Sequence, residues 1–316
     1  MIFIKNGESF DRVNDWAEIQ ARESYHSKLE LTDQQLSDVF GYYDDLPEEI
    51  PCGKSSCRTG HKKGFLVLTE DGLETNLGHV CGSKVFGIAF ENLATDLEKK
   101  ANFHRYLTAL KEAKKNIFLH YQAKAKLEAS EPSLEWVAHK ILDLRDSKIV
   151  GRAGSQALKR MAALGDGKVL LPRRKTKEEM QLSNVMSQKA SDNEDENSED
   201  NVKPQFIDEV IGVVRNPECL LNDYNIALIF ERDIRLVLEE LNNCNPDDIP
   251  EKKVMSLGLK VFRLNERFQF LQDRFEKACI YLTKENFKPL NHQLHLKKSI
   301  SNKDKTLFSS FVNSLP

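Results

Sequence analysis

The longest regular pattern of hydrophobic positions lies in the C-terminal third of the chain. Apolar residues recur there at alternating spacings of three and four between residues 254 and 282. Such spacing places side chains along one side of a helix, and it predicts a coiled-coil seam or the core of a helical hairpin. The seam consists of Val254, Leu257, Val261, Leu264, Phe268, Leu271, Phe275, Ala278 and Leu282. It can pack against a predicted helix over 223–242, or mediate self-association or contact with another protein.

Apolar spacings of three and four also predict helices in the middle of the chain. A long helix is expected over about 89–129, a second over 134–144, and a third over 156–164 that ends at Gly165. Shorter helices are expected over 33–40, where Thr32 and Gln35 form a capping-box pattern, and near 206–214. We therefore predict a mainly α protein: a small zinc-binding α+β module, then long helices and a C-terminal helical hairpin or coiled-coil-like bundle.

A β-hairpin is predicted between residues 64 and 77. Two short apolar runs, 64–69 and 73–77, flank the dipeptide Asp71-Gly72. Glycine adopts the positive φ that tight hairpin turns require, so Asp-Gly between such runs favours a hairpin.

Cysteine and histidine residues surround this hairpin. Cys52, Cys57 and His61 precede it, and His79 and Cys81 follow it. Zinc takes four tetrahedral ligands, commonly thiolates with an imidazole, and a hairpin would return Cys81 to the first pair. We predict a structural zinc site formed by Cys52, Cys57, His61 and Cys81, with His79 as the alternate ligand. The acidic residues near this stretch lie at the far end of the hairpin, which favours a closed site over a catalytic one.

The pattern C-x4-C-x3-H, then a hairpin, then G-x-x-C-G-x-x-x-F-G resembles small zinc modules of the knuckle–hairpin–helix type, including treble clefs and zinc ribbons. It is also similar to a pattern in uncharacterised bacterial and phage proteins. The resemblance covers about 52–87 and implies zinc binding but no activity. Treble clefs usually supply C-x-x-C as the second ligand pair, whereas this chain has Cys81 with His79 nearby.

Composition narrows the class of protein. The 316 residues carry a net charge of −3, and 30% of them are charged. No run of 18 apolar residues exists, so we expect no transmembrane helix. The apolar segment at the start of the chain is too short for a signal peptide. Cysteines clustered with histidines are more typical of a reducing compartment than of a disulfide framework. We expect a cytoplasmic protein.

Basic residues are concentrated in one part of the sequence. Residues 98–177 carry nineteen basic and eight acidic side chains, a net of +11, whereas residues 1–50 carry a net of −8. A surplus of this size is typical of surfaces that attract phosphate backbones. The candidate nucleic-acid-binding residues are Lys99, Lys100, Arg105, Lys111, Lys114, Lys115, Arg173, Arg174 and Lys175. A solvated helix surface is the alternative interpretation.

These patterns divide the chain into six consecutive parts. They are an acidic helical segment (1–50), the zinc module (51–88), a basic helical region (89–177), a disordered linker (178–204), a helical hairpin bundle (205–285) and a loose basic tail (286–316). The linker is predicted from 192–200, which has six acidic and no basic residues and little to bury.

No nucleotide-binding loop, dinucleotide-binding pattern or nucleophile elbow occurs. We expect a non-catalytic zinc-stabilised helical protein that contacts DNA or RNA without sequence preference. One alternative is a protein scaffold acting through the C-terminal heptads. Another is a hydrolase or nuclease whose residues come together only in the fold.

Overall fold

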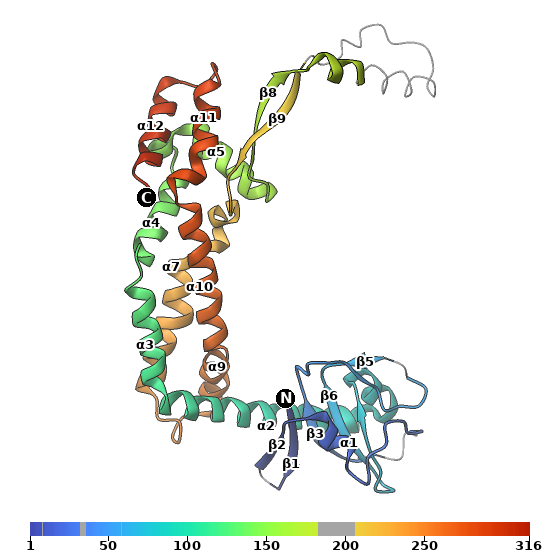
Figure 1. The fold of residues 1–316 in the computed structure, drawn as a ribbon. Helices are drawn as coiled ribbons and strands as arrows, with labels where there is room; N and C mark the ends of the chain where they lie inside the picture. Colours follow the sequence, from blue (N-terminus) through green and yellow to red (C-terminus); the bar gives the residue numbers. More distant parts are fainter. Residues whose placement is uncertain (8, 32–35, 58, 183–205) are drawn as a thin grey trace. The chain divides into compact units, whose positions relative to one another are not determined.

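The computed structural model describes residues 1–7, 9–31, 36–57, 59–182 and 206–316 (Figure 1). The chain forms two compact units, each built from two separate segments. Unit 1 comprises Met1–Phe118 and Val237–Arg263, and unit 2 comprises Leu119–Leu236 and Leu264–Pro316. This organisation differs from the six consecutive parts predicted above, because residues 237–263 return to the N-terminal helix α2. Most of the predicted linker, residues 183–204, lies outside the described residues.

Unit 1 contains a five-stranded antiparallel sheet in the order β2-β1-β3-β6-β7. The strands are β1 (Ile2–Asn6), β2 (Ser9–Val13), β3 (Leu36–Tyr43), β6 (Gly64–Thr69) and β7 (Glu74–Leu77). The predicted hairpin is confirmed: Phe65 pairs with Leu77, Leu68 pairs with Glu74, and Gly72 in the turn has φ +80°.

The predicted helix over 33–40 is wrong from Leu36 onward, and its first residues lie outside the described part of the chain. β3 is instead an inner strand between β1 and β6. Tyr42 and Tyr43 belong to two different hydrophobic clusters, as expected for neighbours in a strand. Pairing with distant strands outweighed the local capping pattern.

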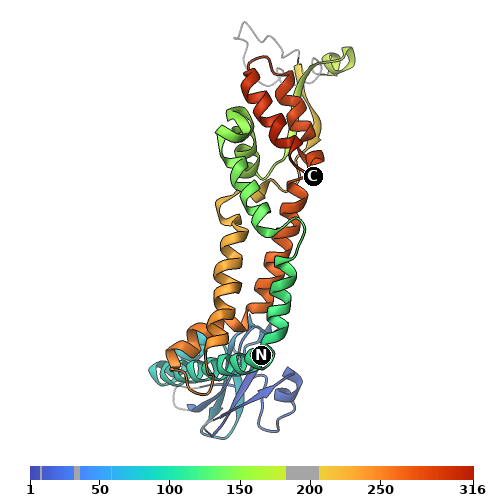
Figure 2. The same ribbon diagram turned by 90° about the vertical axis from the view of Figure 1, so that its left-hand side faces the viewer.

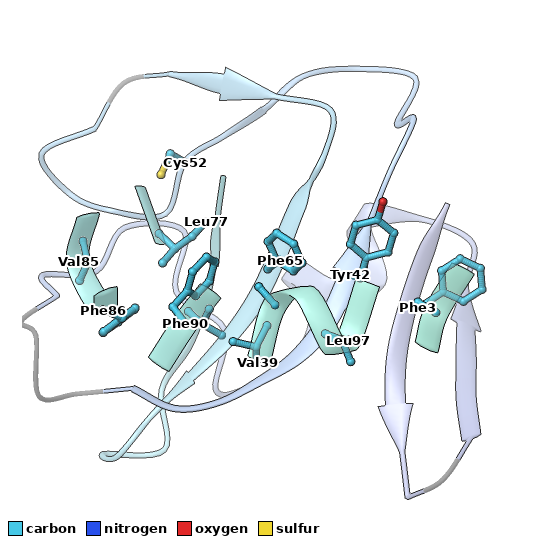
Figure 3. Close-up of a cluster of buried hydrophobic side chains, with 13 residues drawn as sticks. Phe3, Val39, Tyr42, Cys52, Phe65, Leu77, Val85, Phe86, Phe90 and Leu97 are labelled. Carbon is cyan, nitrogen blue, oxygen red and sulfur yellow. The ribbon is translucent and has the colours of Figure 1, made fainter. Parts of the chain in front are cut away.

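Helix α2 (His79–Lys115) packs its apolar side on the sheet. Figure 3 shows Phe65, Leu77, Phe86, Phe90 and Leu97 in this cluster, with Cys52 at its edge. Gly87 has φ +60° and bends the helix, a conformation that side chains other than glycine rarely adopt. A second cluster, which includes Ile19 of the short helix α1 (Trp16–Gln20), contains Tyr43 and Leu66.

Helix α9 (Glu251–Phe262) completes unit 1 by packing against α2. The approach is close at Gly258, where a Cβ atom would lie 2.5 Å from Cβ of Tyr106. Lys114 donates from Nζ to the carbonyl of Leu241 in α8 (Leu236–Asn243), at 3.2 Å.

Unit 2 is largely helical, which agrees with the mainly α prediction. Its longer helices are α4 (Leu134–Arg145), α5 (Ser147–Leu164), α10 (Leu264–Tyr281), α11 (Lys284–Leu296) and α12 (Asn302–Asn313), and α3 (Ile117–Glu128) begins at its boundary. Shorter turns are η1 (Pro217–Leu220), η2 (Asn222–Tyr224), α7 (Ile226–Phe230) and the π-helical η3 (Glu231–Arg235). Ser133 caps α4, and Gly165 ends α5 in the left-handed conformation. No helix among the described residues is long and apolar enough to cross a membrane.

Two further expectations for unit 2 are wrong. Residues 206–214 are not a helix, because β9 (Phe206–Val213) pairs with β8 (Lys168–Arg174). Residues 286–316 are not a loose tail, because Phe287, Leu290, Phe308 and Phe311 are buried. The helices α11 and α12 are short, so each shows only a few apolar repeats in the sequence.

The predicted C-terminal seam is interrupted. Helix α9 ends at Phe262 and α10 begins at Leu264, and the two halves of the seam belong to different units. Val254, Leu257, Val261, Leu264, Leu271 and Phe275 are buried, and Phe268 is half-buried. The side chains expected to mediate self-association are therefore largely covered by their own chain.

Candidate metal centre

Three cysteine side chains meet at the edge of the unit 1 core. The Sγ atoms of Cys52, Cys57 and Cys81 all lie within 4.8 Å of one another, and those of Cys57 and Cys81 are 3.5 Å apart. All three thiols are free. Thiolates clustered in this way are suited to hold a zinc ion or a similarly soft metal.

Local structure brings these cysteines together from two parts of the sequence. Cys52 follows the short strand β4 (Ile50–Pro51), and Cys57 follows a turn closed by its N–H donating to the carbonyl of Lys54 at 2.9 Å. Gly53 donates to the carbonyl of Asn76 in β7 at 2.7 Å. A Cβ atom on Gly53 would lie 1.9 Å from Oγ1 of Thr75, so this close approach requires glycine.

Cys81 is the third residue of α2, after the cap residue Gly78. The partial positive charge at a helix N-terminus favours a thiolate, whereas burial raises the pKa of Cys81. The hairpin therefore returns the chain as predicted, and it places the cluster between a loop and a helix N-terminus.

The pKa values of two of the thiols move in opposite directions. Hydrogen bonds from the backbone and side chain of Thr59 lower the pKa of Cys57 to about 7. Burial, and then the neighbouring Cys57, raise the pKa of Cys81 to about 12. Once Cys57 is ionised, a second thiolate 3.5 Å away is unfavourable unless a cation neutralises the pair. A bound metal ion would supply that cation.

His61, the histidine of the predicted ligand set, has one ring nitrogen without a hydrogen-bond partner. It belongs to the short strand β5 (Gly60–His61), and its Nδ1 is 2.9 Å from the hydroxyl oxygen of Tyr43. Its Nε2 is buried and has no hydrogen-bond partner. The ring packs against Gly78, where a Cβ atom would lie 3.0 Å from Cδ2 of His61. Burial lowers the pKa of His61, which favours the neutral imidazole that metals bind.

Tyr43 belongs to a polar network that positions His61. Asn76 donates from Nδ2 to the hydroxyl of Tyr43 at 3.3 Å and to the carbonyl of Pro51 at 2.9 Å. Tyr25 donates its hydroxyl hydrogen to Oδ1 of Asn76 at 2.8 Å. Metal-binding histidines are commonly oriented through the other ring nitrogen in this way. No residue spacing predicts this network. Its one trace in the sequence is the polar pair Thr75-Asn76 within a short predicted strand, and both residues are fully buried.

His79, the alternate ligand, is placed differently. Its side chain is exposed at the first position of α2, and its ring packs near the rings of Phe65 and Phe90, with centroid distances of 6.2 and 6.1 Å. No ring nitrogen of His79 or His61 lies within 4.8 Å of all three sulfur atoms. Of the two, His61 has the buried, unpartnered nitrogen.

The structure separates the nine predicted nucleic-acid-binding residues into two groups. Six of them, from Lys99 to Lys115, lie on α2 in unit 1, whereas Arg173, Arg174 and Lys175 lie at the end of β8 in unit 2. The two groups therefore belong to different units.

Most of the α2 group contacts acidic or carbonyl groups of unit 1. Lys99 pairs with Glu251 at 2.9 Å, Lys111 with Asp247 at 2.6 Å, and Lys100 with Asp96 at 2.8 Å. Lys114 donates to main-chain carbonyls, as described above, and Lys115 is exposed.

Arg105 is held more firmly than these lysines. Its guanidinium lies 3.6 Å from Asp44 and over the ring of Phe262, 5.1 Å from the centroid, and its side chain is 10% exposed. In unit 2, Arg173 forms ion pairs with Glu179 at 2.7 Å and Glu209 at 3.2 Å. Arg174 is exposed and Lys175 is half-buried.

No protein-family model, no curated protein and no solved structure matches this chain. The candidate metal centre therefore rests on the positions of its own residues.

Proposed function

We propose that this chain is a non-catalytic binding protein whose unit 1 is stabilised by a structural zinc ion. Cys52, Cys57 and Cys81 supply three thiolates, and His61 supplies the fourth ligand through Nε2. The observation that carries the proposal is the cluster of three sulfurs. The buried Nε2 of His61, which has no hydrogen-bond partner, supports His61 as the fourth ligand. Three cysteines and one histidine are a common structural zinc set.

The surroundings of the cluster favour a structural role over a catalytic one. A catalytic zinc site keeps one position open and usually has a carboxylate nearby that acts as a base. The group of clustered ligand atoms among the described residues contains sulfur only. The buried carboxylate of Glu74 is occupied by Arg22, which donates from Nε and a terminal nitrogen at 2.6 and 2.7 Å.

Metal analysis of protein purified without chelators tests the zinc assignment. We expect about one zinc per chain, and we expect Cys81→Ser and His61→Ala to lose it. The matched controls are Cys279→Ser, outside the cluster, and His79→Ala, at the exposed alternate ligand; both should retain the metal. Protein that contains no zinc would refute the proposal, and loss of zinc in His79→Ala but not in His61→Ala would reassign the fourth ligand.

The partner that we propose for this protein is nucleic acid. Support comes from the charge of unit 2. Residues 119–182, 206–236 and 264–316 carry 25 basic and 19 acidic side chains, whereas residues 183–205 carry two basic and six acidic ones. Elution of the intact protein from immobilised heparin and from DNA at comparable, elevated salt supports this partner. A scaffold protein would pass through both columns at low salt. A nuclease would degrade the DNA in a divalent-metal-dependent way.

A further inference from the structure

Three helices of unit 2 pack side by side through small residues. Figures 1 and 2 show α5 beside α11 and α12. At Gly154 of α5, a Cβ atom would lie 2.4 Å from the ring of Phe308, and at Gly151 it would lie 2.8 Å from the carbonyl of Asp304. Leu158, Leu290 and Phe308 are buried. The apolar sides of these helices thus face their neighbours, and their polar sides face solvent.

These helices, together with the turn that joins α11 to α12, carry a large surplus of basic residues. Residues 147–164 contain four basic and no acidic side chains, and residues 284–313 contain six basic and two acidic ones, so the set has a net charge of +8 (10 − 2). Both acidic residues already have partners: Asp304 accepts from the backbone N–H of Arg152 at 3.1 Å, and Glu285 pairs with Lys288. The surplus is therefore not neutralised within the three helices.

Most of the basic side chains are exposed to solvent. The exposed residues are Lys148, Arg152, Lys159, Arg160, Lys288, Lys297, Lys298 and Lys303. The bond between Arg152 and Asp304 joins the start of α12 to α5, and Lys305 donates to the carbonyl of His295 at 3.1 Å, which joins α12 to α11. Basic residues that are far apart in the sequence therefore belong to one packed group of helices. We call the exposed residues of this group the α5–α12 basic surface.

We propose that the α5–α12 basic surface binds the phosphate backbone of duplex nucleic acid without reading its sequence; this inference rests on the proposed partner of the previous subsection. Clustered lysine and arginine side chains bind phosphates and release condensed counterions. Single-strand binding commonly uses exposed aromatic side chains for base stacking. Among the described residues of α5, α11 and α12, no phenylalanine, tyrosine or tryptophan is exposed, which favours a duplex.

An anionic membrane is the main competitor for such a surface. Helices that lie in a membrane interface insert a broad apolar side into the lipid. Here Phe308, Phe311 and Val312 of α12 and Leu290 and Leu294 of α11 are buried inside unit 2. The surface therefore offers charge without a broad apolar side, which is the combination that phosphate backbones require.

The test compares two full-length variants that each lose four positive charges. The first is R152Q/K159Q/K297Q/K298Q, on the α5–α12 basic surface. The matched control is K99Q/K100Q/K111Q/K115Q, on α2, where three of the four lysines pair with acidic groups of unit 1. Binding to a fluorescent DNA duplex of random sequence is measured by anisotropy at several salt concentrations, and circular dichroism confirms that each variant is folded.

We expect the first variant to bind about tenfold or more weakly at low salt, and its log–log salt slope to fall by about 0.9 for each contact removed. The control should stay within about twofold of the wild type. Equal weakening in both variants would overturn the proposed surface while nucleic-acid binding stands. Wild-type protein that ignores DNA and RNA at low salt would overturn both proposals. Binding to anionic vesicles in place of duplex would assign the surface to lipid.

Discussion

The two units use their basic residues in different ways. Unit 1 has 19 basic and 24 acidic side chains, and most of the predicted binding lysines on α2 contact an acidic or carbonyl group of that unit. In unit 2, α5, α11, α12 and the turn that joins α11 to α12 together carry ten basic and two acidic side chains. The comparison teaches that a basic block in a sequence becomes a basic surface only where folding brings no opposite charge to it.

The units also differ in how we expect them to be stabilised. Unit 1 brings three thiols to one point between a loop and the N-terminus of α2, whereas unit 2 relies on packed aromatic and aliphatic side chains. The largest expected effect follows from this difference. Because structural zinc contributes on the order of 10 kcal/mol to the folding of small modules, chelation or Cys81→Ser should unfold unit 1.

Hydrogen exchange followed residue by residue measures this effect. We expect amides of β6, β7 and α2 to lose protection after chelation, while amides of α11 and α12 keep it. Equal protection of unit 1 before and after removal of the metal would contradict a stabilising role for zinc.

Phe308→Ala should have the next largest effect, and it should act on unit 2. The ring is fully buried and contacts Phe287, with a centroid distance of 6.3 Å. Truncation of a buried phenylalanine typically destabilises by about 3–5 kcal/mol. Leu296→Ala is the control, because Leu296 is 54% exposed on the adjacent helix. Urea titration should show a large decrease in the free energy of unfolding for Phe308→Ala and a small one for Leu296→Ala. Equal, small decreases would mean that residues 286–316 are a loose tail.

The ion pair between Glu74 and Arg22 should make unit 1 sensitive to acid. The hydrogen bonds from Arg22 lower the pKa of Glu74 below the ordinary carboxyl value of 4.5. A lowered folded-state pKa means that the stabilisation is present above about pH 4.5 and is lost as the pH falls through the lowered value. Glu74→Gln should cost about 1–3 kcal/mol at pH 7.

Glu74→Gln should also remove the part of the acid sensitivity that comes from protonation of Glu74. Thermal unfolding between pH 7 and pH 3, followed by the signal of unit 1, measures both effects. Parallel curves for wild type and Glu74→Gln over the whole range would show that this pair does not contribute.

Tyr43→Phe should weaken the metal centre without destroying it. The hydroxyl lies 2.9 Å from Nδ1 of His61 and accepts from Asn76, so its loss removes the group that orients the imidazole. Loss of such an orienting partner typically lowers metal affinity about 10–100-fold. Competition with a zinc chelator of known affinity measures the change. The control is Tyr42→Phe, because the Tyr42 ring packs in the hydrophobic cluster with Phe65 and Phe90. This variant should keep its zinc affinity.

Lys111→Gln should produce the smallest effect. The pair with Asp247 is exposed on both sides, with 51% and 73% of the side chains accessible. Exposed pairs of this kind contribute roughly 0.2–1 kcal/mol, and salt screens them. Urea titration should show a slightly lower free energy of unfolding for Lys111→Gln than for the wild type at low salt, and no difference between them at high salt. A loss above about 2 kcal/mol would show that α2 depends on its surface charges.

Much of the fold was predictable where the signal is local. Asp71-Gly72 predicted the hairpin, the spacing of Cys52, Cys57 and Cys81 predicted their convergence, and Gly165 marked the end of α5. Each of these signals acts over a few residues or across one hairpin.

The errors come from partners that are distant in the sequence. Residues 36–40 look helical in isolation, but β3 pairs with β1 and β6. Residues 206–213 form a strand because β8 lies alongside. The sequence pattern also does not show that Lys99 and Lys111 of α2 pair with acidic residues beyond position 240. The polar network around His61 comes from Tyr43 and Asn76, which no spacing rule connects to that histidine.

The division of unit 1 into two segments has a consequence for protein synthesis. Residues 237–263, which pack α9 against α2, emerge from the ribosome more than a hundred residues after residue 118. Until then the side of α2 at Tyr106, which Gly258 later contacts closely, lacks its partner helix α9. Contacts that span such a distance slow folding and leave apolar surface exposed to aggregation. A nascent chain stalled before residue 237 should therefore depend on chaperones, even with its metal ion in place.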